Sequence, residues 1–107
     1  MGRTHDLLVS SLYEALNKFG RYDVVAHNQE YPLEDKINET WGEVDVSALD
    51  LEKNVLYLFE VKSSPNYLKK GRAQLRKAQK YYKQFDVKTE SFLYYKRANS
   101  IYTERVR

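Results

Sequence analysis

The sequence predicts an α/β (α+β) fold, in which a central mixed sheet is flanked by helices. Two segments have apolar residues at helical spacing, and five others have the apolar runs or the alternation that is typical of strands. Their order along the chain is helix, three strands, helix and two strands. With 107 residues, 42% hydrophobic and 31% charged, the chain is expected to form one globular domain over residues 1–107 around a single core.

The first helix is expected over residues 5–19. Thr4 is a candidate N-cap, Asp6 lies in the first turn, where the helix dipole favours an acid, and Gly20 can end the helix. The apolar residues of this segment form one stripe that can face a core: Leu8, Leu12, Ala15, Leu16 and Phe19.

Three strands are expected next, and the third is the most apolar. Residues 55–59 form an unbroken apolar run, which is typical of a central strand that is covered on both faces. A turn at residues 50–54 joins the second strand to the third, and a polar loop leads from the first strand to Trp41. The segments assigned to the three strands are residues 21–29, 42–46 and 59–63.

A second helix follows the third strand. The Ser-Ser-Pro sequence at residues 63–65 signals its start, and the helix is expected over residues 66–85. Two more strands are expected at residues 91–96 and 101–106. Because the helix is long enough to cross the sheet, the fourth strand is expected to lie parallel to the third. The helix residues expected to face the sheet are Leu68, Leu75, Ala78, Tyr82 and Phe85.

Three charged residues interrupt the apolar strands. Side chains two apart on a strand share a face, so Glu60 and Lys62 project together, and an antiparallel hairpin brings Asp45 beside Glu60. Burying three charges at one place costs free energy unless they pair or bind a cation. Mg²⁺ takes one or two carboxylates together with water and substrate phosphate. The alternative is an ordinary ion pair between Glu60 and Lys62 on an exposed face.

The pattern of Asp45, Glu60 and Lys62 resembles the PD-(D/E)xK nuclease superfamily. The Gly-Glu-Val-Asp form of residues 42–45 is similar to the branch with small RecB-type nucleases and archaeal Holliday junction resolvases, although Val44 stands where the name-giving Pro would be. The resemblance implies a restriction-endonuclease-like αβββαβ core. It also implies hydrolysis of phosphodiester bonds in nucleic acid, with DNA as the expected substrate and Mg²⁺ or Mn²⁺ as the cofactor.

The resemblance assigns roles to the residues of this motif. Asp45 and Glu60, with the main-chain carbonyl of Val61, would hold the metal. Lys62 would orient the attacking water or neutralise charge on the phosphate. We therefore expect the carboxylates of Asp45 and Glu60 to lie close enough for one hard cation to bridge them, with the Lys62 ammonium in the same cavity.

A third acid is expected from elsewhere in the chain. In the resembling nucleases a Glu of the first helix reaches the metal site, and Glu14 is the matching position. The alternative for Glu14 is an exposed residue paired with Lys18 one helical turn away. Glu43 shares a strand face with Asp45 and is another candidate for the third acid. His27 has no metal-ligand companion at helical or strand spacing, and His5 is far from it in sequence.

The charge is unevenly distributed along the chain. Residues 1–60 carry 5 Lys and Arg against 12 Asp and Glu, whereas residues 61–107 carry 13 against 3. A basic half beside a carboxylate pair suits a polyanionic substrate, although a solvated basic face is the alternative. Gln74 and Tyr81 are similar to the Gln…Tyr motif of RecB-type nucleases, with Gln79 as an alternative to Gln74. The residues expected to contact nucleic acid are Lys69, Lys70, Arg72, Gln74, Arg76, Lys77 and Tyr81.

Composition limits the other possibilities. The chain has no cysteine, which excludes disulfides, Cys-ligated zinc and the iron–sulfur cluster of some RecB-type nucleases. We expect no membrane association and a cytoplasmic location, including association with the nucleoid or presence in the host cell of a virus. A homodimer is a further expectation, because a second copy could complete the grip on substrate. A non-catalytic nucleic-acid-binding module, or a small subunit of a larger nuclease, is the alternative function.

Overall fold

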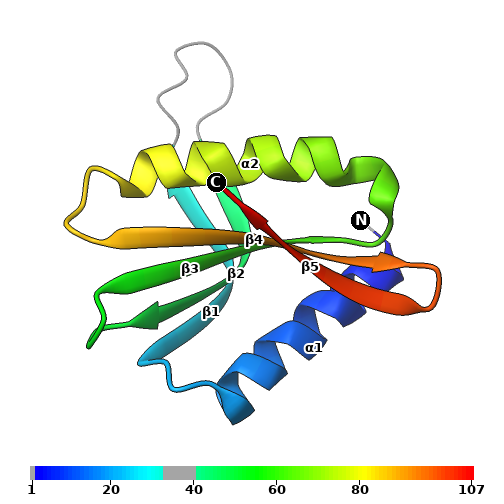
Figure 1. Cartoon of the computed structure of the whole chain (residues 1–107), viewed down its shortest axis with the longest axis horizontal. Coiled ribbons are helices and arrows are strands. Elements are labelled where there is room, and N and C mark those ends of the chain that lie inside the picture. Colours follow the sequence, from blue (N-terminus) through cyan, green and yellow to red (C-terminus); the bar gives the residue numbers. More distant parts are fainter. Residues whose placement is uncertain (1, 33–40) are drawn as a thin grey trace.

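The computed structural model describes residues 2–32 and 41–107. The predicted order of helix, three strands, helix and two strands is confirmed (Figure 1). Most of the polar loop predicted before Trp41 lies outside the described residues, and Pro32 belongs to the first strand. The elements are α1 (Arg3–Phe19), β1 (Val24–Pro32), β2 (Trp41–Asp50), β3 (Val55–Lys62), the 3₁₀ turn η1 (Pro65–Tyr67), α2 (Leu68–Tyr82), β4 (Lys88–Arg97) and β5 (Ser100–Val106).

The five strands form one mixed sheet in the order β1-β2-β3-β4-β5. Three neighbouring pairs are antiparallel, and β3 with β4 is the parallel pair. The parallel pairing was expected, because α2 provides the crossover connection that a parallel pair requires. The chain is therefore an α+β protein with a mixed sheet, as the sequence predicted.

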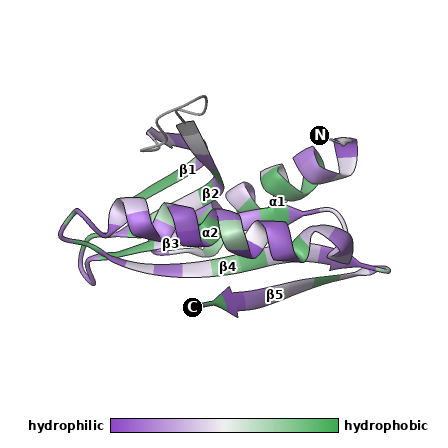
Figure 2. Ribbon diagram, turned by 90° about the horizontal axis from the view of Figure 1, so that it is seen from above, coloured by the Kyte–Doolittle hydropathy of each residue, from purple (hydrophilic) through white to green (hydrophobic). Residues whose placement is uncertain are grey.

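Each helix covers one face of the sheet, which explains the unbroken apolar run of β3. Leu58 packs with Leu75 and the rest of the cluster under α2, whereas Phe59 and Val61 pack with Leu12 of α1. Successive residues of β3 alternate between two cores, so both of its faces are apolar. In Figure 2 hydrophilic colours dominate the part of α2 that faces the viewer.

The α1 helix differs in detail from the prediction. Its N-cap is Gly2, which makes no side-chain cap, and Thr4 lies inside the helix, so the predicted Thr4 cap is wrong. Phe19 is 76% exposed and Ala15 is also exposed, so neither belongs to the core stripe. The buried residues of α1 are His5, Val9 and Leu12.

The α2 helix is shorter than predicted because a 3₁₀ turn precedes it. The Ser64 hydroxyl accepts a hydrogen bond from the Asn66 N–H at 3.3 Å, so it caps this turn, and the helix proper begins at Leu68. The helix ends at Tyr82, and Phe85, predicted to face the sheet, is 50% exposed.

The sheet divides between β2 and β3 at the positions of Asp45 and Glu60. Backbone pairing of these strands ends at Val46 and Phe59, but β2 continues along β1, and β3 continues along β4. Figure 1 shows β1 and β2 turning behind α2 while β3 and β4 run on beneath it. The register of β1 with β2 also skips Asn28, which has a left-handed φ of 53°. We call this division the fork; it positions the functional site.

Candidate functional site

The two carboxylates at the fork replace backbone hydrogen bonds that the diverging strands lose. Asp45 and Glu60 are 4% and 3% exposed. The Asp45 N–H donates to Glu60 Oε1 at 3.3 Å, and the Val61 N–H donates to Asp45 Oδ2 at 2.8 Å. Each carboxylate therefore satisfies a buried N–H of the opposite strand, which offsets part of the cost of burying both. The structure brings Asp45 and Glu60 together, as expected.

The protonation of Glu60 is strongly perturbed. The pKa of Glu60 is raised to about 8, first by burial and then by the negative charge of Asp45, while the Lys62 ammonium opposes both effects. The raised pKa means that the pair holds one proton over much of the neutral range unless another positive charge arrives. A divalent cation is one such charge, and two carboxylates are what Mg²⁺ usually takes from a protein. The donor set therefore fits a hard cation.

Lys62 is held between a carboxylate and an amide. Its Nζ lies 3.7 Å from Glu60 Oε2 and donates to Gln74 Oε1 at 2.8 Å. Gly71 of α2 allows this close approach, since a Cβ at Gly71 would lie 2.5 Å from a Leu93 methyl and 3.2 Å from Lys62 Cε. Gln74 thus orients the ammonium toward the carboxylate pair. The sequence singled out Gln74 as a nucleic-acid contact, and its observed contact is with Lys62.

His5 is a site residue that the sequence reasoning missed. Its Nε2 lies 3.3 Å from Asp45 Oδ2, and its side chain is buried. The other ring nitrogen, Nδ1, has no hydrogen-bond partner among the described residues and lies 3.5 Å from Asp6 Oδ1. The available signal was helical spacing, since His5 precedes Val9 and Leu12 by four and seven residues and therefore occupies the apolar stripe.

The structure does not bring Glu14 to the fork. Glu14 is exposed and follows His5 by nine residues, which turns it about 180° around α1 and moves it about 13 Å along the axis. Glu43, the other candidate for the third acid, has a pKa that is influenced by Asp45. Partial burial raises its pKa, and the charges of Asp45 and Glu30 raise it further, while His5 lowers it. Of the two candidate acids, Glu43 is the one whose pKa responds to the charge of Asp45.

No ready-made cage for a cation is present in the described part of the chain. Within residues 2–32 and 41–107, no three His, Asp or Glu side chains form a group that could hold a metal by themselves. Asp45 and Glu60, with the carbonyl of Val61, are the groups that could hold one. Water and a substrate phosphate would supply the remaining oxygens, as is usual for Mg²⁺.

Tyr81, which the sequence predicts to contact nucleic acid, is half-buried and packs against other tyrosines. Its ring stacks on buried Tyr31 at a centroid distance of 5.2 Å and meets Tyr82 edge-on at 4.9 Å. The pKa of Tyr31 is raised to about 12, mainly by burial and secondly by the charge of Glu60. Tyr81 therefore belongs to the wall that covers the fork from the α2 side.

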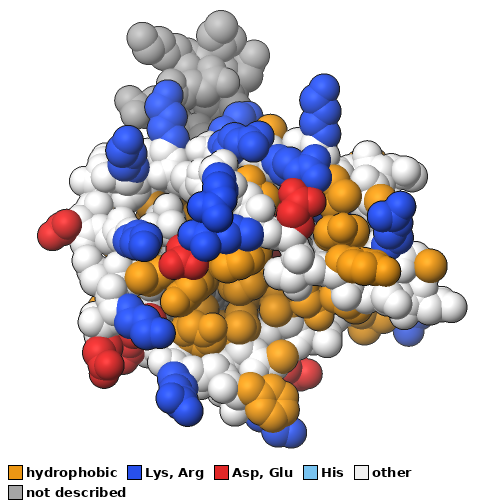
Figure 3. All heavy atoms as spheres, in the orientation of Figure 1, with side chains coloured by type: hydrophobic (Ala, Val, Ile, Leu, Met, Phe, Trp, Pro, Cys, Tyr) orange, Lys and Arg blue, Asp and Glu red, His pale blue; other side chains and the backbone are white. Residues whose placement is uncertain are grey.

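The basic residues of α2 divide into two groups. Arg72 forms a two-bond ion pair with Glu104, at 2.7 and 2.8 Å, so its charge is already matched. Figure 3 shows Lys and Arg side chains gathered over α2, with few acids among them. The predicted contact residues that remain exposed are Lys69, Lys70, Arg76 and Lys77.

A cavity of about 420 Å³ lies where the start of α1 approaches the start of η1. Its cationic lining residues are Arg3 and Lys96, and Ser63, directly after Lys62, lines it as well. This basic cavity, which an anionic group could enter, is therefore lined by the residue that directly follows Lys62 in the sequence.

Comparison with known proteins establishes the fold class. No family model matches the chain, and no curated protein matches it. A solved structure described as the crystal structure of SSO0001 has the same fold, with a TM-score of 0.62 and 20% sequence identity over 96% of this chain. The match covers 50% of that structure's chain, so the present chain spans half its length. At this identity the likeness shows the shared α+β fold alone.

None of the helices described here has both the length and the apolar character that crossing a bilayer requires.

Proposed function

We propose that this chain is a metal-dependent nuclease that hydrolyses phosphodiester bonds of nucleic acid, with DNA as its substrate. The observation that carries the proposal is the buried carboxylate pair of Asp45 and Glu60 with the Lys62 ammonium 3.7 Å from Glu60. The resemblance of this motif to the PD-(D/E)xK superfamily supports the same conclusion. The basic second half of the chain supplies the affinity that a polyanion needs.

The carboxylate pair would hold Mg²⁺ or Mn²⁺ together with the carbonyl of Val61. When bound, the ion polarises the scissile phosphate and lowers the pKa of a coordinated water. The protein's own contribution is orientation: the Val61 N–H and His5 Nε2 both contact Oδ2 of Asp45, which fixes that carboxylate. Glu43, whose pKa is raised by desolvation and by the charge of Asp45, would bind the outer water shell.

Lys62 would act on the water and the phosphate. An ammonium has three donors, of which one is occupied by Gln74 Oε1. The remaining donors can hold the attacking water or neutralise charge that develops on phosphate oxygens. A positioned cation in a site that excludes water stabilises a transition state strongly. The exposed cations of α2 would hold the nucleic-acid backbone by phosphate contacts, which give affinity without sequence preference.

The test is incubation with Mg²⁺ or Mn²⁺ across single-stranded, duplex, flap and four-way-junction DNA, and RNA. We expect metal-dependent cleavage that is abolished by a chelator and by Asp45→Ala. Asp50→Ala is the matched control, because Asp50 ends the same strand and lies outside the fork. Absence of cleavage on every substrate with either metal would overturn the proposal.

A non-catalytic nucleic-acid-binding module is the second candidate. It is favoured by the backbone hydrogen bonds of Asp45 and Glu60, because the same contacts would also stabilise the fork in a protein without activity. In that case unchanged protein and Asp45→Ala would bind nucleic acid equally and neither would cleave it. The homodimer remains a prediction, which sedimentation at several protein concentrations would test.

A further inference from the structure

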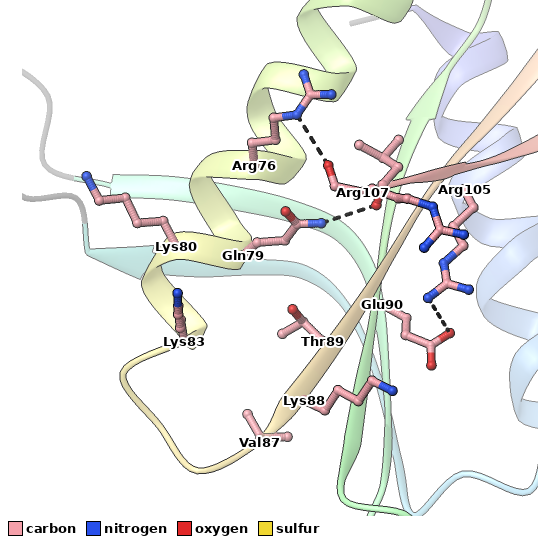
Figure 4. Close-up of a pocket in the computed structure, with 11 residues that line it drawn as sticks. Arg76, Gln79, Lys80, Lys83, Val87, Lys88, Thr89, Glu90, Arg105 and Arg107 are labelled. Carbon is pink, nitrogen blue, oxygen red and sulfur yellow. Dashed lines mark hydrogen bonds and ion pairs between the residues drawn. The ribbon is translucent and has the colours of Figure 1, made fainter.

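A basic groove of about 610 Å³ lies where α2, the start of β4 and the end of β5 meet (Figure 4). None of the residues of the carboxylate fork lines it. Its cationic lining residues come from all three segments: Arg76, Lys80, Lys83, Lys88, Arg105 and Arg107.

The groove exists because β5 is shorter than β4. The last pair between these strands joins Ser91 to Val106, so the preceding residues of β4 have β3 on one side and no described strand on the other. Gln79 fixes α2 above this edge, with its Nε2 donating to Ser91 Oγ at 2.7 Å and to the Val106 carbonyl at 3.3 Å. The wall of the groove is therefore held by direct hydrogen bonds.

The groove has more cationic than acidic side chains, although Arg76 Nε donates to the main-chain oxygen of Arg107 at 3.5 Å. Glu90 is its one acidic lining residue, and it pairs with Arg105 at 3.8 Å. Elsewhere on α2, Arg72 has its own carboxylate partner, Glu104, so its charge is matched, unlike most of the cations that line the groove. Like charges that converge around a hollow repel each other, and a bound polyanion relieves that repulsion.

We propose that this groove binds the phosphate backbone of a nucleic acid, as a second contact with the substrate in addition to the carboxylate fork. The proposal rests on the proposed function, because it places the groove on the same substrate. The lining favours a backbone over bases: it contains no aromatic ring, and its apolar side chains are Val87 and Val106. Lys, Arg and the Thr89 hydroxyl are donors that phosphate oxygens accept readily.

The groove is tested by the salt dependence of binding in the presence of a chelator. A labelled oligonucleotide is titrated with unchanged protein, with the double variant Lys83→Gln/Lys88→Gln, and with the control Lys18→Gln/Arg21→Gln. The control removes the same charge from exposed residues near the end of α1. Two lost phosphate contacts should lower the slope of log affinity against log salt by about 1.8 on duplex, or about 1.4 on a single strand.

An unchanged slope in the groove variant, with folding verified by circular dichroism, would overturn the proposal. Equal losses in the groove and control variants would also overturn it, as would displacement of the oligonucleotide by an acidic peptide at a lower charge concentration than by unlabelled DNA. Because metal is absent, the outcome is independent of cleavage. If the unchanged protein never cleaves but the groove variant has a lower salt slope, the groove proposal stands and the nuclease proposal fails. If the protein cleaves and the groove variant has an unchanged slope, only the nuclease proposal stands.

Discussion

In the described part of the chain, β2 stops pairing with β3 at the fork, and β4 extends beyond its last pair with β5. These two places carry opposite charge in different surroundings. At the fork, Asp45 and Glu60 are buried and accept hydrogen bonds from the backbone. At the edge, Lys83 and Lys88 are exposed to solvent beside the groove.

Burial decides what each charge can do. At the fork it raises the pKa of Glu60 and makes the protonation state depend on whatever else binds there. In the groove Lys83 and Lys88 are exposed to solvent, so they can attract a polyanion over a long range. The first arrangement suits a reaction and the second suits affinity.

The largest effect is expected from Glu60→Gln. The change removes an anionic ligand while keeping an oxygen that can accept the Asp45 N–H, so the fork should still fold but cleavage should vanish and metal affinity should fall. Calorimetric titration with Mg²⁺ or Mn²⁺ measures the second effect. Glu90→Gln makes the same chemical change in the basic groove and should leave metal binding intact. Equal metal affinity in the two variants would contradict a cation site at the fork.

Lys62→Ala should lower cleavage by about 10²-fold or more, which is the range for losing a positioned charge in a water-excluded site. Both carboxylates remain, so metal and DNA should still bind. Single-turnover cleavage alongside metal titration separates the two. Lys69→Ala, an exposed lysine of α2, is the matched control and should affect only binding. Loss of metal binding in Lys62→Ala would instead assign the lysine to assembly of the site.

The free energy of unfolding should fall as the pH rises from about 4.5 to about 8. Across that interval folded Glu60 keeps a proton that the unfolded chain, with an ordinary pKa of 4.5, has released. This contribution is complete below the unfolded pKa and is lost through the folded one. Urea unfolding at several pH values measures it without metal. Glu60→Gln should remove this contribution, and a slope that survives in that variant would assign it to another group.

The smallest effect is expected from Glu14→Gln. Glu14 lies on the side of α1 opposite His5, so its charge should not influence the fork, and cleavage should stay within about 2-fold of the unchanged protein. Glu43→Gln should lower cleavage more, since the pKa of Glu43 responds to Asp45 and His5. Steady-state rates of the two variants decide between them, and a larger loss with Glu14→Gln would reverse this assignment.

Local periodicity made much of the fold predictable. The order of elements, the parallel pair of β3 and β4, and the convergence of Asp45, Glu60 and Lys62 follow from strand alternation and from the length of the crossover. These features depend on residues that are close in sequence or on short connections.

Contacts over long separations were not predictable. His5 meets Asp45 across 40 positions, and Arg72 meets Glu104 across 32, because the rotation and depth of each helix are set by packing against the finished sheet. Glu14 illustrates the same point: its helix was predicted correctly, but the side of the helix that faces the fork was not.

Gly71 makes the position of the Lys62 ammonium depend on a spacing between layers. The backbone of α2 comes close to β3 and β4 at this residue because glycine has no Cβ. A Cβ there would clash with Leu93, which is fully buried and cannot move aside into solvent. An alanine there would act as a wedge, lifting the helix and drawing Gln74 away from the amine while every charged group keeps its identity. The position of the Lys62 ammonium relative to its carboxylate partner therefore depends on the packing distance between α2 and the sheet.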